Sequence, residues 1–309
     1  MAMVQYGLWP NCTNHCDFCL LLDREYKSVN ERLNMLSAIK ENIKYVDWKG
    51  KFSNGISLLG GEIYYTESEK IKASFLELIE EIIEVIIKPN KEAVYSTVTN
   101  GIYDSKVLLE PTLELFNKHD VIDQVDINFS WDLKYRFHND ESLQLMIKNV
   151  NMVHDKYPQL YPTVQTCLTQ YLIDAHLEGG FSLLEYQKEH FPNTRLSLLY
   201  PHKINTGKVL DDFFFKRDSL FKFIKYLKAT NQNELVQHLI QSVINSSQFK
   251  YTGLWERNSL YEKKKDDKEL KQRPTLENKQ NLTECGHSDM YRCYTDSDKC
   301  LLCDLLKVI

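Results

Sequence analysis

A strand and a helix follow one another in GISLLGGEIYYTESEKIKASFLELIEEIIEVIIK, residues 55–88. The apolar run over residues 55–60 predicts a buried strand. Further on, apolar side chains recur three and four positions apart with acidic ones between them. This pattern predicts a helix over 68–88 that packs on a sheet and stops at Pro89. The stretch therefore predicts one β/α unit.

The same alternation continues on both sides of this unit. Short β-branched or aromatic runs predict strands at 3–9, 55–60, 92–99, 123–131, 163–172 and 194–200. Segments of helical period predict helices at 30–46, 68–88, 105–118, 140–156, 178–190 and 211–228. Parallel strands joined by right-handed helical crossovers form an open sheet or a partial barrel, and ligands bind at the carboxyl ends of its strands. The sequence therefore predicts an α/β fold of six β/α units.

Composition and charge narrow the class of protein. Of the 309 residues, 43% are hydrophobic, and 38 basic residues face 43 acidic ones for a net charge of −5. This balance gives no overall basic field for nucleic acid, although a local basic patch is not excluded. No run of eighteen apolar residues occurs, and the start MAMVQYGLWPNC lacks the features of a signal peptide. We therefore expect a cytoplasmic protein without a membrane segment.

Three of the eight cysteines, Cys12, Cys16 and Cys19, stand close together in CTNHCDFC. In a chain without an export signal, such a group indicates metal ligands sooner than disulfides. Thiolates are the natural ligands of iron–sulfur clusters, and three of them leave one iron of a four-iron cluster open to a small molecule. A zinc site with its fourth ligand elsewhere, or three unrelated buried cysteines, remain the alternatives. The separate Cys167 is expected to be a buried strand residue.

Two motifs together carry a family resemblance. The CxxxCxxC spacing with Phe18 before its last cysteine, and the run LLGGE with Gly60, Gly61 and Glu62, resemble the radical S-adenosylmethionine (SAM) superfamily. The resemblance implies a partial (β/α)6 barrel and a [4Fe-4S] cluster whose fourth iron is chelated by SAM. Reductive cleavage of SAM would give a 5'-deoxyadenosyl radical that abstracts a substrate hydrogen. Phe18 would lie beside the adenine, and the two glycines would offer carbonyl groups to the SAM ammonium, although Ile63 stands where the family usually has proline.

Further site residues follow from the same resemblance. In STVTNG, Asn100 matches the family's TNG turn beside the cofactor, while an ordinary Asn-Gly turn is the alternative. The run INFSWD is similar to the ISLDG run of peptide-modifying members, with Ser130 and Asp132 in matching places and Trp131 in place of leucine. Arg136 would pair with the SAM carboxylate through its planar fork, unless it is a surface arginine.

A second group of cysteines lies in the tail ECGHSDMYRCYTDSDKCLLCD. Four thiols within so short a segment predict a second metal site, formed by Cys285, Cys293, Cys300 and Cys303. This set suits an auxiliary iron–sulfur cluster like that of the twitch and SPASM extensions of the superfamily. A zinc site in which His287 replaces Cys293 competes with it.

The sequence therefore predicts a radical SAM barrel over residues 1–228 and a helical, cysteine-rich extension over 229–309. The resemblance implies a radical SAM oxidoreductase or mutase that needs a reductant such as flavodoxin or ferredoxin. A peptide is the favoured substrate, because the INFSWD run and the cysteine-rich tail are both features of peptide-modifying enzymes. A nucleotide, modified base or small metabolite is the alternative substrate. A non-catalytic zinc-binding interaction module is the alternative from another class.

Overall fold

The computed structural model describes residues 3–16, 18–19, 25–48, 55–137, 139–199 and 215–239. The tail residues of the predicted second metal site lie outside the described residues: Cys285, His287, Cys293, Cys300 and Cys303. Within the described part of the chain, no helix is both long enough and apolar enough to cross a membrane.

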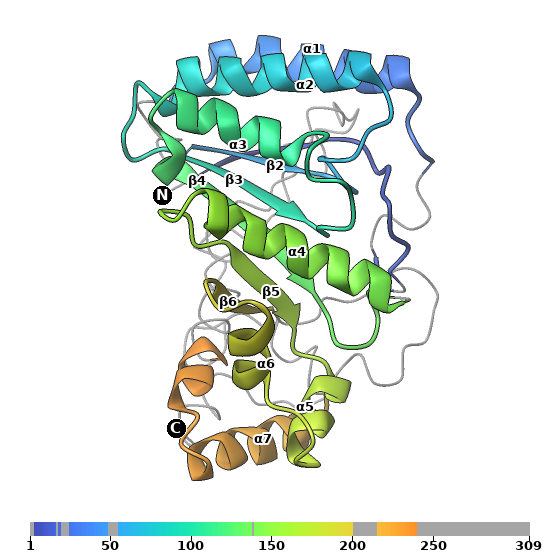
Figure 1. The fold of residues 1–309 in the computed structure, drawn as a ribbon, viewed down its shortest axis with the longest axis vertical. Helices are drawn as coiled ribbons and strands as arrows, with labels where there is room; N and C mark the ends of the chain where they lie inside the picture. Colours follow the sequence, from blue (N-terminus) through green and yellow to red (C-terminus); the bar gives the residue numbers. More distant parts are fainter. Residues whose placement is uncertain are drawn as a thin grey trace, which may run out of the picture. The chain divides into compact units, whose positions relative to one another are not determined.

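The strands form one six-stranded sheet in the order β1-β2-β3-β4-β5-β6 (Figure 1). They are β1 Val4–Gly7, β2 Gly55–Leu59, β3 Val94–Thr99, β4 Val125–Trp131, β5 Thr163–Cys167 and β6 Arg195–Leu199. Neighbours from β1 to β5 pair in parallel. The open sheet and its order confirm the predicted α/β fold with six strands of a partial barrel.

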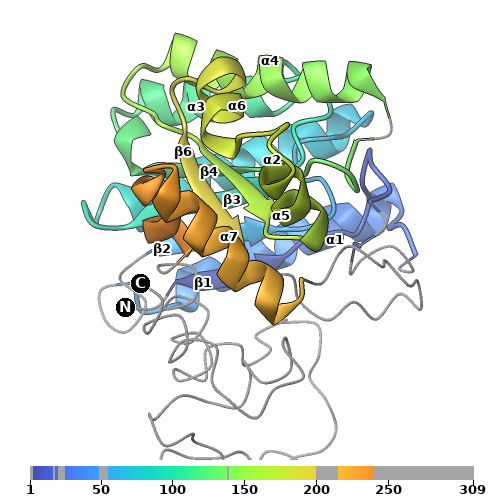
Figure 2. The ribbon, with the colours of Figure 1, turned by 90° about the horizontal axis from the view of Figure 1, so that it is seen from below.

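The helices are α1 Val29–Asn42, α2 Glu69–Ile82, α3 Leu109–Lys118, α4 Asp140–Lys156, α5 Gln170–Leu177, α6 Leu183–His190 and α7 Arg217–Ala229. Right-handed crossovers between successive parallel neighbours place the connecting helices on one face of a sheet. Figures 1 and 2 show α1, α2, α3 and α4 on the same side of strands β2, β3 and β4. We call the opposite side of these strands the inner face.

Local sequence explains where these helices begin. Ser28 and Glu31 form a reciprocal capping box at the start of α1. Ser68 caps α2 and Asn139 caps α4, each through a side-chain oxygen that accepts a backbone N–H of the first turn. The buried stripe of α2 consists of Ile71, Phe75, Leu78, Ile79 and Ile82. This stripe confirms the helix predicted from the spacing of apolar residues.

Two predicted elements differ most from the structure, while the helix predicted over 105–118 begins only at Leu109. The strand predicted over 163–172 ends at Cys167, because Thr169 accepts a hydrogen bond from the Leu172 N–H (3.1 Å) and begins α5. Alternating apolar residues at a strand end cannot be distinguished by period from the first turn of a helix. The helix predicted over 178–190 is also wrong in its first part, since α6 begins only at Leu183, and Gly179 (φ +77°) follows the end of α5. Cys167 is half-buried rather than buried.

The chain divides into two compact units. Strands β1–β4 with helices α1–α4 belong to the first unit, and helices α5 and α7 belong to the second. The cysteine loop, residues 8–19, and every described site residue below lie in the first unit. The predicted boundary at residue 228 stays a prediction, because residues 240–309 lie outside the described part.

The second unit buries an imidazole completely. His176 on α5 has 0% exposure, and its Nε2 accepts a hydrogen bond from the Leu183 N–H (3.2 Å). Its ring centroid lies 5.3 Å from that of Phe181 and 5.0 Å from that of Phe223. Burial lowers the pKa of His176 to about 4, so the ring is neutral near pH 7.

We expect this imidazole to make folding stability depend on pH. The pKa in the folded state, about 4, lies below the ordinary 6.5, so the stabilisation is complete above pH 6.5 and declines as the pH falls toward 4. Each unit of pKa difference corresponds to about 1.4 kcal/mol. In urea unfolding across this range, the wild type should lose more free energy of unfolding than His176→Asn, which keeps an acceptor but does not titrate. Equal losses in the two proteins would contradict the assignment.

Candidate functional site

The cysteine loop is fixed to the end of β2 by backbone hydrogen bonds. The Gly61 N–H donates to the carbonyl oxygen of Trp9 (2.8 Å). The Glu62 N–H donates to the carbonyl oxygen of Asn11 (2.7 Å). These bonds continue the contact between β1 and β2 beyond their last paired residues. The LLGGE run and the cysteine loop therefore form one structural unit at the carboxyl edge of the sheet.

The two glycines of LLGGE are required by this close approach. A Cβ at Gly61 would lie 2.3 Å from the carbonyl oxygen of Pro10 and 2.4 Å from that of Asn11. A Cβ at Gly60 would lie 2.9 Å from the carbonyl oxygen of Trp9. A side chain at either position would push the cysteine loop away from β2. The predicted approach of a ligand to these glycines stays a prediction, and the structure shows that they let the cysteine loop approach β2.

The three cysteines of this loop are free thiols. Cys16 is 5% exposed, while Cys12 and Cys19 are half-buried. Burial raises the pKa of Cys12 to about 11, and burial likewise raises the pKa of Cys16. The neighbouring Cys16 charge contributes to the rise at Cys12, and the Cys19 charge to that at Cys16. In the described part of the chain, no three His, Cys, Asp or Glu side chains are arranged as a metal site.

Glu62 is a fully buried carboxylate that joins the ends of β2 and β3. It accepts hydrogen bonds from the Tyr64 N–H (3.0 Å), the Thr99 hydroxyl (2.8 Å) and the Asn100 N–H (2.8 Å). Burial raises the pKa of Glu62 to about 7, and these hydrogen bonds with the Arg136 charge oppose the rise. That Glu62 binds the cofactor stays a prediction, and in the structure its carboxylate joins residues at the ends of β2 and β3.

Asn100 contacts the cysteine loop directly. Its Nδ2 donates to Cys12 Sγ (3.3 Å) and to Thr13 Oγ1 (3.2 Å), while its Oδ1 accepts the Ile102 N–H (2.7 Å). Gly101 takes φ +71°, which glycine adopts without strain. The bond from the Ile102 N–H to the Asn100 side chain is that of an Asx turn, and the NH2 group of the same side chain faces a cysteine.

The loop after β4 brings Arg136 next to Phe18 of the cysteine loop. The guanidinium carbon lies 5.2 Å from the ring centroid of Phe18, a cation–π distance. Its Nε is buried and has no hydrogen-bond partner among the described residues. The Arg136 charge acts against the rise in the pKa of Cys16. Asp132, 3% exposed, accepts the N–H groups of Lys134 and Tyr135 and so shapes this loop.

Ser130 belongs to a row of polar residues on the inner face of β4. Tyr95 contacts Phe116 of α3 (5.1 Å between ring centroids), so its register partner Val125 points toward the helices. Side chains alternate along a strand, which places Asp126, Asn128 and Ser130 on the inner face. All three side chains are polar there.

This polar row continues onto the neighbouring strands. Gln165 of β5 lies opposite Ser130 in the register and donates to Asn128 Oδ1 (2.9 Å). Asn128 donates to Asp126 (3.1 Å), which also accepts a hydrogen bond from Arg195 (3.0 Å). A packed barrel interior would carry branched apolar residues instead. The inner face therefore suits hydrogen-bonding groups.

Asn14, a residue that the motif analysis did not single out, contacts both neighbouring cysteines. Its N–H donates to Cys12 Sγ (3.4 Å), and its Nδ2 donates to Cys16 Sγ (3.2 Å) and to the Arg136 carbonyl oxygen (2.7 Å). The sequence held a signal for these contacts, because asparagine side chains commonly bond to nearby groups of their own loop.

These residues fit an iron–sulfur cluster with an anionic small molecule beside it. Three free thiols on one loop supply the ligands, and the amides of Asn14 and Asn100 supply hydrogen bonds to sulfur. The unpartnered Nε of Arg136 is a donor for a carboxylate. Of the predicted site residues in the described part, the structure thus places Phe18, Arg136, Asn100 and the three cysteines together.

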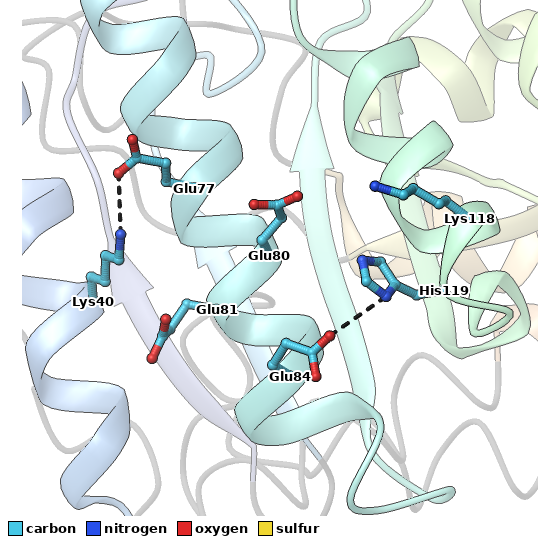
Figure 3. A pocket seen from close by; sticks show the side chains of 7 residues that line it. All are labelled: Lys40, Glu77, Glu80, Glu81, Glu84, Lys118 and His119. Atoms are coloured by element: carbon cyan, nitrogen blue, oxygen red, sulfur yellow. Dashed lines mark hydrogen bonds and ion pairs between the residues drawn. The ribbon is translucent and has the colours of Figure 1, made fainter.

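Two surface hollows of the structure are lined by no residue of the cysteine loop. One, of about 360 Å³, is lined by acidic and basic side chains of α1, α2, the helical turn Ile83–Ile87 and the end of α3 (Figure 3). Lys40 pairs with Glu77 (3.1 Å) and His119 lies 3.5 Å from Glu84. No residue of the cysteine loop lines this hollow, and its charged groups have the character of a solvated helix surface.

Comparison with known proteins gives structural likeness only. No family model and no curated protein matches the chain. The solved structure of native anSMEcpe with bound AdoMet matches with a TM-score of 0.48 and 16% identity, over 76% of this chain and 63% of that one. HydG, a maturase of the [FeFe]-hydrogenase, matches with a TM-score of 0.45 and 8% identity, over 73% of this chain and 49% of that one. The chain thus spans less than two thirds of either, and scores this low do not establish a shared activity.

We expect Gly61→Ala to disturb the cysteine loop strongly. Its Cβ would lie 2.3 Å from a backbone oxygen, so the two backbones must separate and lose the hydrogen bonds between them. The loss of free energy of unfolding should be on the order of 2–4 kcal/mol, as for other severe steric conflicts. Gly7→Ala is the matched control, since nothing lies within 4 Å of its Cβ position. Urea unfolding measures both, and equal stability of the two variants would contradict the role of Gly61.

Proposed function

We propose that this chain is a radical SAM enzyme in which Cys12, Cys16 and Cys19 hold a [4Fe-4S] cluster and SAM binds at the remaining iron. One observation carries the proposal: three cysteines share a loop that is fixed to both the GGE and TNG segments, and two of their sulfurs accept asparagine N–H groups. When bound, the cluster and SAM would supply a 5'-deoxyadenosyl radical that abstracts a hydrogen from the substrate.

The surrounding residues receive separate roles in this proposal. Arg136 orients the SAM carboxylate through its unpartnered Nε, and Phe18 packs beside the adenine. Gly60 and Gly61 offer carbonyl oxygens to the SAM ammonium while keeping the loop on β2. Glu62 acts as a positioning residue, because its carboxylate is fully buried and holds the Asn100 turn.

The polar inner face supports a substrate rich in hydrogen-bonding groups. Ser130 and Gln165 are both half-buried and lie opposite each other on β4 and β5. Serine hydroxyls and glutamine amides can each donate and accept, as recognition of peptide groups requires. We therefore propose peptide modification, with the enzyme acting as an oxidoreductase or a mutase.

The remaining parts of the proposal concern partners and the tail. The cysteine-rich tail would hold an auxiliary iron–sulfur cluster on Cys285, Cys293, Cys300 and Cys303, or zinc with His287 in place of Cys293. The first cluster needs an electron donor such as flavodoxin or ferredoxin. A reducing cytoplasm suits free thiols of this kind.

Replacing Cys16 with alanine should abolish both iron binding at the first site and SAM cleavage, because the cluster loses one of its three ligands. Cys300→Ala should lower total metal content but spare SAM cleavage. Cys167→Ala is the control, since Cys167 is a half-buried cysteine at the end of β5 that belongs to neither cysteine group of the sequence. Iron analysis and 5'-deoxyadenosine assays of anaerobically reconstituted proteins measure these outcomes. Full SAM cleavage by Cys16→Ala would refute the proposed cluster site.

The substrate class can be tested by competition. Candidate peptides and nucleotides are added separately to the reconstituted protein with SAM and a chemical reductant, and 5'-deoxyadenosine is measured. We expect peptides to stimulate its formation several-fold, because the inner face offers amide and hydroxyl groups. Stimulation by nucleotides alone would replace the peptide with the alternative substrate, and Cys16→Ala supplies the background rate.

A further inference from the structure

Two asparagine side chains, one within the cysteine loop and one at the end of β3, donate to cysteine sulfurs. Asn14, within the loop, donates through Nδ2 to Cys16 Sγ at 3.2 Å. Asn100, at the end of β3, donates through Nδ2 to Cys12 Sγ at 3.3 Å. The backbone N–H of Asn14 adds a third donor to Cys12 Sγ at 3.4 Å. Two of the three cysteines are thus supplied with N–H groups by named side chains.

The orientation of both amides is fixed by their other partners. Asn100 Oδ1 accepts the Ile102 N–H (2.7 Å), so the NH2 end must be the one that faces Cys12. Asn14 donates to the Arg136 carbonyl oxygen (2.7 Å), and only the NH2 end can make that bond. A flipped amide would lose these contacts in each case. The N–H groups therefore point at sulfur for structural reasons that do not depend on a bound metal.

Donors placed in this way favour negative charge on sulfur. Hydrogen bonds to ionised acceptors are stronger than those to neutral ones, and the sulfurs of a reduced cluster carry more negative charge than those of an oxidised cluster. Hydrogen bonds to sulfur are one of the means by which a protein sets the reduction potential of an iron–sulfur cluster. Each amide should therefore stabilise the reduced cluster more than the oxidised one.

We propose that Asn14 and Asn100 are positioning residues that raise the reduction potential of the cluster on Cys12, Cys16 and Cys19. The inference rests on the proposed function, since it requires the cluster. It goes beyond that function by assigning to two amides the control of how easily the cluster accepts its electron. Asn14 also fixes the loop that carries Arg136, so it connects the cysteine loop with the proposed carboxylate-binding residue.

The test compares the midpoint potential of the reconstituted cluster in wild type, Asn14→Ala and Asn14→Asp, followed by electron paramagnetic resonance at fixed potentials. Alanine removes the donor, whereas aspartate is similar in size but adds a negative charge beside Cys16. We expect the order wild type, then Ala, then Asp, from highest to lowest potential. If Asn14→Ala weakens the reduction equilibrium tenfold, its midpoint potential falls by about 59 mV, because the cluster takes up one electron. Asn42→Ala is the control, because this half-buried asparagine donates to the Ala38 carbonyl oxygen within α1.

Each outcome has a defined meaning. Unchanged potentials in both Asn14 variants with full iron content would overturn the inference and leave the proposed function intact. A wild-type protein that binds no iron–sulfur cluster would overturn both. If the variants fail to bind iron, wild-type protein labelled with 15N-asparagine decides: coupling between the reduced cluster and 15N supports the inference, and its absence refutes it.

Discussion

The buried carboxylate of Glu62 holds the carboxyl ends of β2 and β3 together. A carboxylate removed from water must be hydrogen-bonded, since a buried unpaired charge costs several kcal/mol at least. Glu62 meets this requirement with donors from Tyr64, Thr99 and Asn100. Its own backbone carbonyl accepts the indole N–H of Trp9 (3.2 Å), at the start of the cysteine loop. The cysteine loop is therefore bonded to the backbone of Glu62 directly and to its side chain through Asn100.

Two arginines stack on aromatic rings of the cysteine loop. Arg136 lies over Phe18, and Arg32 of α1 lies over Trp9, with its guanidinium carbon 4.2 Å from the ring centroid. Arg32 is 7% exposed and donates to the Tyr65 carbonyl oxygen (3.1 Å). Burial lowers the pKa of Arg32 to about 10, which still leaves it charged near pH 7. Of these two cations, Arg136 opposes the rise in the pKa of both Cys16 and Glu62.

Much of the fold could be predicted because its elements have strong periodicity. The stripe of α2 from Ile71 to Ile82 and the β-branched run of β3 were recognisable from spacing alone. The region around Thr169 was not, because the alternating residues of β5 run directly into the first turn of α5. Only the capping bond of Thr169, a contact between a side chain and a backbone three residues away, separates the two elements.

The sequence by itself determined the residue types of the candidate site and the order of strands that carries them, since both follow from local pattern and spacing. Tertiary structure alone decided what each residue touches. It showed that Gly61 accommodates the cysteine loop, that Glu62 joins two strand ends, and that Asn14 and Asn100 face sulfur. The contacts of Gly61, Glu62 and Asn100 join residues up to 88 positions apart, and no local pattern encodes them, because they exist only when parallel strands bring their carboxyl ends to one edge.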